Sequence, residues 1–299
     1  MVGSLIYCVD GGATKSRARL VDAVGKAHAA AEGGPCNPAI DLDRAVTNFA
    51  ALWRHCAGLA GVEPEQTGDV VLSIGAAGLY VPSARARFLA AIPRFLETIA
   101  ASDGYAALIG AGGGKPCGLI TIGTGVAGHR LWSNGLSVQR DGWGWIGGDR
   151  GGGAWLGIKA LRHTLRVVDG IHAKDGLSER VLASIGNRAR LVETVNDLSP
   201  DRVAALAPIL LAAAEAGVPR AAAIRDRAVE HLAALALVLD IDKGETLYAA
   251  GGLAASLAPR LAERLSRGVA LPESDAMHGC YLLAAGQAPA EHIIDEVTL

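Results

Sequence analysis

Three glycine turns, each placed at the end of a short apolar run, constrain this chain more than any other feature. The runs and their turns are Leu5–Val9 with Asp10-Gly11-Gly12, Leu119–Ile122 with Gly123-Thr124-Gly125, and Thr246–Ala250 with Gly251-Gly252. Short apolar runs that end in turn residues are typical of buried strands. Because glycine has no side chain, the backbone of such turns can approach a phosphate, or pack on a flat ring, where a Cβ would block the way. Together the turns fit one nucleotide held between two halves of the chain.

The composition predicts a compact protein that acts on a small molecule. Hydrophobic residues make up 51% of the 299 residues and the net charge is −2, which excludes an intrinsically disordered chain. No basic run is interleaved with aromatic residues, so we expect no nucleic-acid partner and no binding to an anionic membrane surface. The longest apolar stretches, including Ala204–Ala214 and Leu232–Leu239, are shorter than the ~20 residues that span a bilayer. No signal-peptide pattern precedes Asp10, and we therefore expect a cytoplasmic protein.

The order of strand and helix patterns predicts a mixed α/β fold. Strand patterns lie at Leu5–Val9, Ser16–Val21, the segment after Gly25, Val70–Ile74, Phe95–Ile99, Leu119–Ile122 and Thr246–Ala250. Helical patterns lie after Asp41 and at Pro82–Ile92, Gly104–Ile109, Ala154–Val168, Pro200–Ala216, Pro219–Leu239 and Leu253–Leu265. A strand that leads into a glycine turn recurs at Leu119, which indicates two related halves. We place the first domain at residues 1–112 and the second at 113–299, with a last helix from Ser274 that can pack back on the first domain.

The first turn, from Asp10 to Ser16, lies in a predicted hairpin between two strands. Its phosphate-facing backbone would come from Gly11, Gly12, Thr14 and Lys15. Asp10 would face the same phosphates, and a carboxylate beside a polyphosphate needs a divalent cation between them, so we expect Mg²⁺ held by Asp10, partly through water. The P-loop spacing G-x-x-x-x-G-K-[ST] is absent. The alternative is an ordinary glycine-rich β-turn in which the Asp10 side chain accepts a backbone hydrogen bond.

These motifs resemble those of a known superfamily. Asp10-Gly11-Gly12-x-Thr14, Gly123-Thr124-Gly125 and Ala250-Gly251-Gly252 resemble the phosphate-1, phosphate-2 and adenosine motifs of the sugar kinase, Hsp70 and actin superfamily. Ser102-Asp103-Gly104-Tyr105, residues 142–149 (GWGWIGGD) and Pro272-Glu273-Ser274-Asp275-Ala276 resemble the N-acetylglucosamine and glucosamine kinase branch of the BadF/BadG/BcrA/BcrD-type ATPases. The resemblance covers nearly the whole chain. It implies two RNase H-like (actin-like ATPase) domains with a central interdomain cleft, ATP and Mg²⁺ as cofactors, and a homodimer as one possible assembly.

The resemblance implies that Asp103 is the catalytic base. Asp103 follows a predicted strand and begins a short helix, and the dipole of a helix N-terminus favours the ionised carboxylate. In phosphoryl transfer one carboxylate accepts the proton of the attacking hydroxyl. The alternative is that Asp103 is only the N-cap of that helix, a role in which aspartate is common.

Sugar contacts are expected from two further segments. Asp149 shares a glycine-rich loop with Trp143 and Trp145, and a carboxylate beside aromatic rings can bind the hydroxyls and the apolar face of a sugar. The resemblance implies that Asn37, Trp143, Gly144 and Asp149 contact the sugar. For Asn37 the alternative is an Asx turn before Pro38. Several relatives have Glu where this chain has Arg150, and a cation pointing inward there would disfavour a glucosamine ammonium.

We therefore expect an ATP-dependent amino-sugar kinase that phosphorylates the 6-hydroxyl of N-acetylglucosamine or glucosamine. One alternative is an ATPase activator of a 2-hydroxyacyl-CoA dehydratase-like radical enzyme, which holds an Fe–S cluster with cysteine thiolates. The five cysteines are widely spread with no C-x-x-C pair, which disfavours both that cluster and a zinc site. A second alternative is a nucleotide- or sugar-binding regulator without catalysis. The histidines have no H-x-x-x-H spacing that would indicate a metal site.

Overall fold

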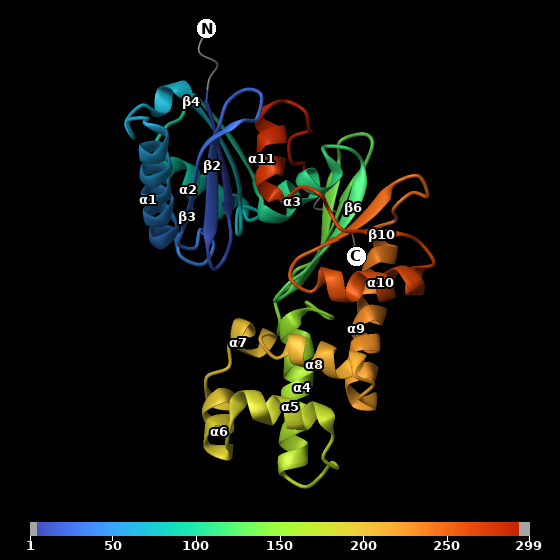
Figure 1. Ribbon diagram of the computed structural model, residues 1–299. Coiled ribbons are helices and arrows are strands. Elements are labelled where there is room, and N and C mark those ends of the chain that lie inside the picture. The colour runs from blue at the N-terminus through green and yellow to red at the C-terminus, as the bar shows by residue number, and fades with distance from the viewer. Residues whose placement is uncertain (1–4, 293–299) are drawn as a thin grey trace. The chain divides into compact units, whose positions relative to one another are not determined.

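The computed structural model describes residues 5–292, and it contains two five-stranded sheets with helices packed on them (Figure 1). This confirms the mixed α/β class that the sequence predicts. The chain divides into two compact units. Unit 1 holds residues 5–117, 129–138 and 272–292, and unit 2 holds residues 118–128 and 139–271. The domain boundary expected between residues 112 and 113 stays a prediction.

The chain begins with three consecutive strands, and a run of helices follows the strands of the second sheet. The strands are β1 (Leu5–Gly11), β2 (Ser16–Val21), β3 (Ala27–Gly33), β4 (Val70–Ala76), β5 (Glu97–Ser102), β6 (Cys117–Ile122), β7 (Val126–Leu131), β8 (Ser137–Asp141), β9 (Thr246–Ala250) and β10 (Val269–Ala270). The helices are α1 (Leu42–Ala60), the 3₁₀ turn η1 (Thr67–Asp69), α2 (Pro82–Ala91), α3 (Asp103–Gly112), α4 (Gly153–Val168), α5 (Gly176–Ile185), α6 (Arg188–Asn196), α7 (Pro200–Ala204), α8 (Ala207–Glu215), α9 (Pro219–Val238), α10 (Ala254–Leu265) and α11 (Ala276–Ala284).

The sheet of unit 1 has the order β3-β2-β1-β4-β5, with β1 antiparallel to β2 and parallel to β4. Successive side chains of a strand point to opposite faces, so each face of β1 has its own core. Tyr7 and Val9 pack in one core with Phe49 and Trp53 of α1. Ile6 and Cys8 pack in the other with residues of α3 and α11. Both faces of the sheet are therefore covered.

Helices α3 and α11 cross at very short range in unit 1, side by side in Figure 1. A Cβ on Gly279 would collide with the carbonyl oxygen of Ala106, and one on Gly110 with that of Asp275. The glycines are needed because backbone meets backbone at this crossing. The helix expected from Ser274 onward thus lies on α3 and β1, with Asp275 as its N-cap.

Unit 2 buries an Ala- and Leu-rich core between the second sheet, of order β10-β9-β6-β7-β8, and helices α4, α5, α8, α9 and α10. The single helix predicted for Pro200–Ala216 is wrong: it is two helices, α7 and α8, separated at residues 205–206. Pro208 explains the break, because a proline lacks the N–H group and its ring clashes with the carbonyl four residues earlier, here the last residue of α7. Helices α5 and α6 were not predicted.

Among residues 5–292, no single helix is long and apolar enough to cross a membrane. The segment Pro200–Glu215, which holds α7 and α8, and helix α9 together have the length and composition of a membrane span, but they are bent by 114° relative to each other.

Candidate active site

Asp10 and Gly11 end β1, and the chain turns back through Gly12–Lys15 into β2, so the predicted hairpin is confirmed. The turn is closed by the N–H of Gly12, which donates to the carbonyl of Lys15 at 2.9 Å. Thr14 and Lys15 at its tip are exposed. The tip of the predicted phosphate-1 turn is therefore accessible, whereas Gly11 at its base is buried.

Arg17, directly opposite Asp10 in the β-ladder, joins two carboxylates of unit 1. Its Nη2 lies 2.6 Å from Asp10 Oδ2 and its Nη1 lies 3.1 Å from Asp275 Oδ2. Asp275 Oδ1 also accepts from the N–H of His278 as the cap of α11. This pairing orients the Asp10 carboxylate and links it to the start of α11. Neither partner was identified from the sequence as part of the site.

Asp103 occupies the first position of α3, and Ser102 is the N-cap: its Oγ accepts from the N–H of Tyr105 at 3.1 Å. The capping role weighed for Asp103 is thus filled by its neighbour. The Asp103 side chain keeps solvent-accessible surface, as a base that must reach a substrate requires.

The surroundings of Asp103 make its carboxylate a stronger proton acceptor than an ordinary aspartate. Protein atoms packed around it remove part of its hydration and raise its pKa, and the charges of Asp10 and Glu291 raise it further. Hydrogen bonds from the backbone of Gly104 and of Asp103 itself act in the opposite direction.

Asp10 fits a Mg²⁺ ion that arrives with a nucleotide. Mg²⁺ keeps several waters and is usually bound through one or two carboxylates plus substrate phosphates. Asp10 can supply one such oxygen. In the described part of the chain, no group of three or more His, Cys, Asp and Glu side chains could hold a metal. The described residues therefore fit a cation that binds together with a nucleotide, and they do not form a metal site made of protein ligands alone.

Asn37 forms the Asx turn that was the alternative to its sugar role. Its Oδ1 accepts from the N–H of Ala39 at 3.2 Å, and its carbonyl accepts from Ile40 and Asp41. The side chain is half-buried and lies against Gly78, where a Cβ would collide with Oδ1. The turn uses the amide oxygen and leaves the Nδ2 group for a sugar hydroxyl, so the two roles are compatible.

In unit 2, the predicted phosphate-2 turn Gly123–Gly125 is bonded to the N-terminus of α4. The N–H of Gly153 donates to the carbonyl of Gly123 at 2.8 Å, and that of Ala154 to the carbonyl of Thr124 at 2.9 Å. The Thr124 hydroxyl donates to Asp201 Oδ1 of α7 at 3.1 Å. The proton of the Thr124 hydroxyl is therefore directed at Asp201, and a phosphate at this turn would compete with that carboxylate for it.

Asp149 is buried and lies directly against this turn, because a Cβ on Gly125 would collide with its carboxylate. Desolvation raises the pKa of Asp149 and the charge of Asp141 adds to this, while backbone hydrogen bonds from Val126 and Gly144 lower it. Oδ1 of Asp149 has no hydrogen-bond partner among the described residues. Leaving a buried acceptor without a hydrogen bond costs free energy. A ligand hydroxyl that donates to Oδ1 would remove this cost, so the unpaired oxygen is typical of a ligand-binding position.

The loop that leads to Asp149 is held by one carboxylate. Asp141 Oδ1 accepts from the N–H of Gly142 at 2.9 Å and from that of Asp149 at 3.0 Å. Trp143 stays 79% exposed within this loop, and its neighbour Gly144 donates to Asp149. Arg150 is exposed on the other side of Asp149, and its charge contributes to the lowered pKa of His231 in α9.

The predicted adenosine turn lies beside the phosphate-2 strand. Gly251 has φ +96°, which favours glycine, and a Cβ there would lie 2.6 Å from the carbonyl oxygen of Ile122 at the end of β6. The same oxygen accepts from the N–H of Leu253 at 3.0 Å. The second and third glycine turns are thus brought together at neighbouring strand ends.

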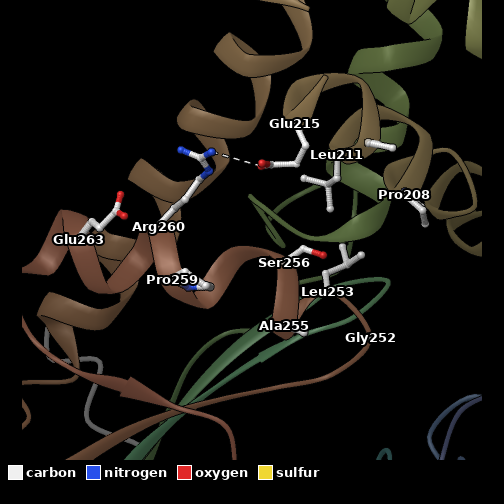
Figure 2. Close-up of a pocket in the computed structure, with 11 residues that line it drawn as sticks. Pro208, Leu211, Glu215, Gly252, Leu253, Ala255, Ser256, Pro259, Arg260 and Glu263 are labelled. Carbon is white, nitrogen blue, oxygen red and sulfur yellow. Dashed lines mark hydrogen bonds and ion pairs between the residues drawn. The ribbon is translucent and has the colours of Figure 1, made fainter. Parts of the chain in front are cut away.

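A cavity of about 590 Å³ opens next to Gly252, between α8 and α10 (Figure 2). This size falls in the range of about 300–1,000 Å³ that is usual for small-ligand pockets. Its walls are lined by Pro208, Leu211, Ala212, Glu215, Gly252, Leu253, Ala255, Ser256, Pro259, Arg260 and Glu263. Arg260 Nη2 pairs with Glu215 Oε1 at 3.2 Å on one side of it. The mixture of apolar walls and a few polar groups suits a nucleoside.

Comparison with known proteins decides the family. The model of the BadF/BadG/BcrA/BcrD ATPase family matches residues 8–269. The chain belongs to this family. The family resemblance drawn from residues 102–105, 142–149 and 272–276 is confirmed, and membership of this ATPase family implies the use of ATP.

Individual relatives narrow the comparison within the family. The chain is 22% identical over 283 residues to the glucosamine kinase GspK of Vibrio cholerae serotype O1, covering 92% of this chain and 94% of that protein. A solved structure from Chromobacterium violaceum, provisionally described as an N-acetylglucosamine kinase, is 30% identical with a TM-score of 0.86, covering 95% of this chain and 99% of the other. Both are similar over nearly their full length.

A third comparison concerns the fold alone. A ROK family glucokinase from Streptomyces griseus, solved with glucose and AMPPNP, has a TM-score of 0.56 at 18% identity, covering 95% of this chain and 99% of the other. The mixed α/β fold with two five-stranded sheets is therefore shared with that structure, and the fold class that the sequence predicts is confirmed.

Proposed function

We propose that this BadF/BadG/BcrA/BcrD family member is an ATP-dependent hexosamine kinase, which transfers the γ-phosphoryl group to the 6-hydroxyl of N-acetylglucosamine or glucosamine. The observation that carries the proposal is the carboxylate of Asp103 at the start of α3, which is solvent-accessible and whose pKa is raised by desolvation and by the charge of Asp10. The names of the relatives from Vibrio cholerae and Chromobacterium violaceum support an amino sugar as the acceptor. A cytoplasmic location, where ATP is available, is part of the proposal.

In the proposed reaction Asp103 accepts the proton of the sugar hydroxyl as its oxygen bonds to the γ-phosphorus. The bond between the γ-phosphorus and the bridging oxygen breaks, and ADP leaves with that oxygen. Bound Mg²⁺ would neutralise charge on the phosphate oxygens, with Asp10 as its protein ligand. Residues Gly11, Gly12, Thr14 and Lys15 would contact one phosphate, Gly123–Gly125 another, and Gly251 and Gly252 the nucleoside.

The sugar contacts are proposed for Asn37, Trp143, Gly144 and Asp149. Of these residues Asp149 has the most structural support as a sugar ligand, because its buried Oδ1 has no hydrogen-bond partner among the described residues. A sugar hydroxyl that donates to Oδ1 would relieve the cost of leaving this acceptor unsatisfied. Arg150, the residue after Asp149, is exposed. Turnover with glucosamine and with N-acetylglucosamine tests whether the protein favours a free amine or an acetamide at carbon 2 of the sugar.

The cysteines do not support the activator alternative. All five are buried, and burial raises the pKa of Cys8 and Cys36 to about 12 and that of Cys56 to about 11. Thiolates that hold a cluster need a depressed pKa and access to the iron. All five thiols are buried, and the pKa of Cys8, Cys36 and Cys56 is raised, which is the opposite of what a cluster needs.

The direct test is to identify the product. The purified protein is incubated with ATP, Mg²⁺ and each hexosamine, and the phosphorylated sugar is analysed by two-dimensional ¹H–³¹P NMR. We expect the phosphorus to couple to the two protons on carbon 6. A phosphorus coupled to the anomeric proton, or no phosphorylated sugar from any hexosamine, would contradict the proposal.

A further inference from the structure

Glu291 follows α11, 189 positions along the chain from Ser102. Its side chain is only 3% exposed. Its Oε2 accepts from the backbone N–H of Ser102 at 3.0 Å, and its Oε1 accepts from the Ser102 hydroxyl at 2.6 Å. A buried carboxylate persists only when it is paired and hydrogen-bonded. Glu291 therefore has a defined partner, the residue immediately before Asp103.

Ser102 transmits this contact to the first turn of α3. Its hydroxyl donates to Glu291 and accepts from the N–H of Tyr105, so both interactions fix one rotamer of the cap. Tyr105 is held from the same segment, since its hydroxyl donates to the carbonyl of Pro289 at 2.8 Å. Asp103 lies between these two anchored residues.

Arg85 of α2 balances the charge of Glu291. Its Nη1 lies 3.2 Å from Oε2, and its Nη2 donates to the carbonyl of Ala100 in β5. The same guanidinium thus holds both the buried carboxylate and the strand that leads to Asp103. An ion pair of this kind adds geometric definition even where its net contribution to stability is small.

We propose that Glu291 is a positioning residue for Asp103, fixing the junction of β5 and α3 so that the base keeps its place at the helix start. The inference rests on the proposed kinase function, in which Asp103 accepts the proton. The contacts of the Glu291 carboxylate are to Ser102 and Arg85. It acts through Ser102, Arg85 and, by way of the same segment, Tyr105.

Glu291 also acts on Asp103 through its charge. Together with Asp10 on β1, it raises the pKa of the Asp103 carboxyl. His129 of β7 faces the same turn, because a Cβ on Gly104 would collide with its ring. Replacing Glu291 by glutamine removes its charge and leaves Asp10 and His129 in place. A change in the pH dependence of kcat in this variant is therefore due to the charge of Glu291.

The test compares Glu291→Gln with Glu97→Gln, which removes an exposed carboxylate from β5, the strand that leads to Asp103. In Glu291→Gln the amide nitrogen replaces one acceptor oxygen, so a donor of Ser102 or Arg85 loses its partner. We expect kcat to fall between about 10- and 100-fold, the effect of a small misplacement of a catalytic group, with KM for ATP within about twofold. The acid limb of the kcat profile should move to lower pH. Glu97→Gln should match the wild-type protein in each measurement.

Hydrogen–deuterium exchange of the backbone amides at residues 102–106 needs no substrate. These amides should exchange faster in Glu291→Gln than in the wild type, and at the wild-type rate in Glu97→Gln. Tyr105→Phe, which removes the contacts of the hydroxyl to the carbonyls of Pro289 and Ala290, should raise exchange there to a smaller extent and keeps the test open if Glu291→Gln does not fold. Sugar-dependent turnover in the wild type with unchanged kcat, acid limb and exchange in Glu291→Gln would overturn this inference alone. No sugar-dependent turnover in the wild type would overturn the proposed function and this inference with it.

Discussion

Arg17 holds the carboxylate of Asp10 through an Nη2–Oδ2 contact of 2.6 Å, opposite it in the β1–β2 ladder. The same guanidinium reaches Asp275, the N-cap of α11. The residue proposed to hold Mg²⁺ is thus oriented by a strand neighbour and a helix start of the same unit. The charge of Asp10 contributes to the raised pKa of Asp103. Arg17 therefore influences both the proposed Mg²⁺ ligand and the proposed catalytic base.

Replacing Arg17 by methionine should move the acid limb of kcat/KM to higher pH. Without the guanidinium the full charge of Asp10 acts on Asp103 and raises its pKa further. Asp103 must be ionised to accept a proton, so activity is then lost at a higher pH as the solution is acidified. The pH profile of kcat/KM measures this. Arg19→Met, at an exposed position of the same strand, is the matched control. An acid limb that stays in place in Arg17→Met would contradict the account of this pair.

Asp103→Asn should lower kcat by about 10²- to 10⁴-fold, the usual contribution of a general base, with KM for ATP nearly unchanged. The fold should not suffer, because Ser102 and not Asp103 caps α3. Steady-state kinetics, with the melting temperature as a check on folding, test this. A variant with near-wild-type kcat would remove Asp103 from the mechanism.

Asp149→Asn should separate stability from sugar binding. The wild-type side chain is a buried carboxylate with a raised pKa, an oxygen without a partner and φ +55°. Asparagine tolerates this backbone conformation, carries no charge to desolvate and can still accept from Val126 and Gly144. We expect an equal or higher melting temperature without ligand. The stabilisation by sugar, about 2.7 kcal/mol at a hundredfold excess over Kd in the wild type, should disappear.

The ATP-induced shift of Asp149→Asn should persist, because Asp149 is placed on the sugar. Differential scanning fluorimetry with each ligand alone measures both shifts. Loss of the sugar and ATP shifts together, at an unchanged melting temperature of the free protein, would show that Asp149 serves the nucleotide turn against which it packs.

Ala255→Phe should weaken nucleotide binding without loss of fold. Ala255 is exposed on α10 and lines the cavity beside Gly252, so a phenyl ring there fills the space assigned to the nucleoside (Figure 2). Isothermal titration with a non-hydrolysable ATP analogue should give at least about a tenfold higher Kd, a loss of 1.4 kcal/mol. Leu237→Phe, at an exposed position of α9 outside the cavity, should bind as the wild type does. Equal affinities in the two variants would place the nucleoside elsewhere.

Much of the fold follows from local patterns that the sequence displays. The apolar runs before Gly11, Gly123 and Gly251 predicted β1, β6 and β9, because a short run that ends in glycine has few other uses in a compact chain. The spacing of apolar residues after Asp41 predicted α1, and Asp41 is its N-cap. The break between α7 and α8 was missed although Pro208 signalled it.

The supporting residues of the site could not be predicted in the same way. Ser102 and Glu291 are 189 positions apart, and no periodicity or short motif connects them. Arg17 alternates with apolar neighbours as any exposed strand residue does, and only the ladder register places it opposite Asp10. Local patterns specify elements and turns, whereas these pairings arise from tertiary packing. Ser102 is the exception, since a serine before an acidic helix start is a recognisable N-cap.

The most direct test of the account is sugar-stimulated release of ADP by the wild-type protein, measured in a coupled assay. The acceptors are glucosamine, N-acetylglucosamine, N-acetylmannosamine and glucose, each with ATP and with or without Mg²⁺. The account predicts Mg²⁺-dependent turnover that glucosamine or N-acetylglucosamine stimulates more than glucose does. Release of ADP at the same rate with and without every one of these sugars would contradict it.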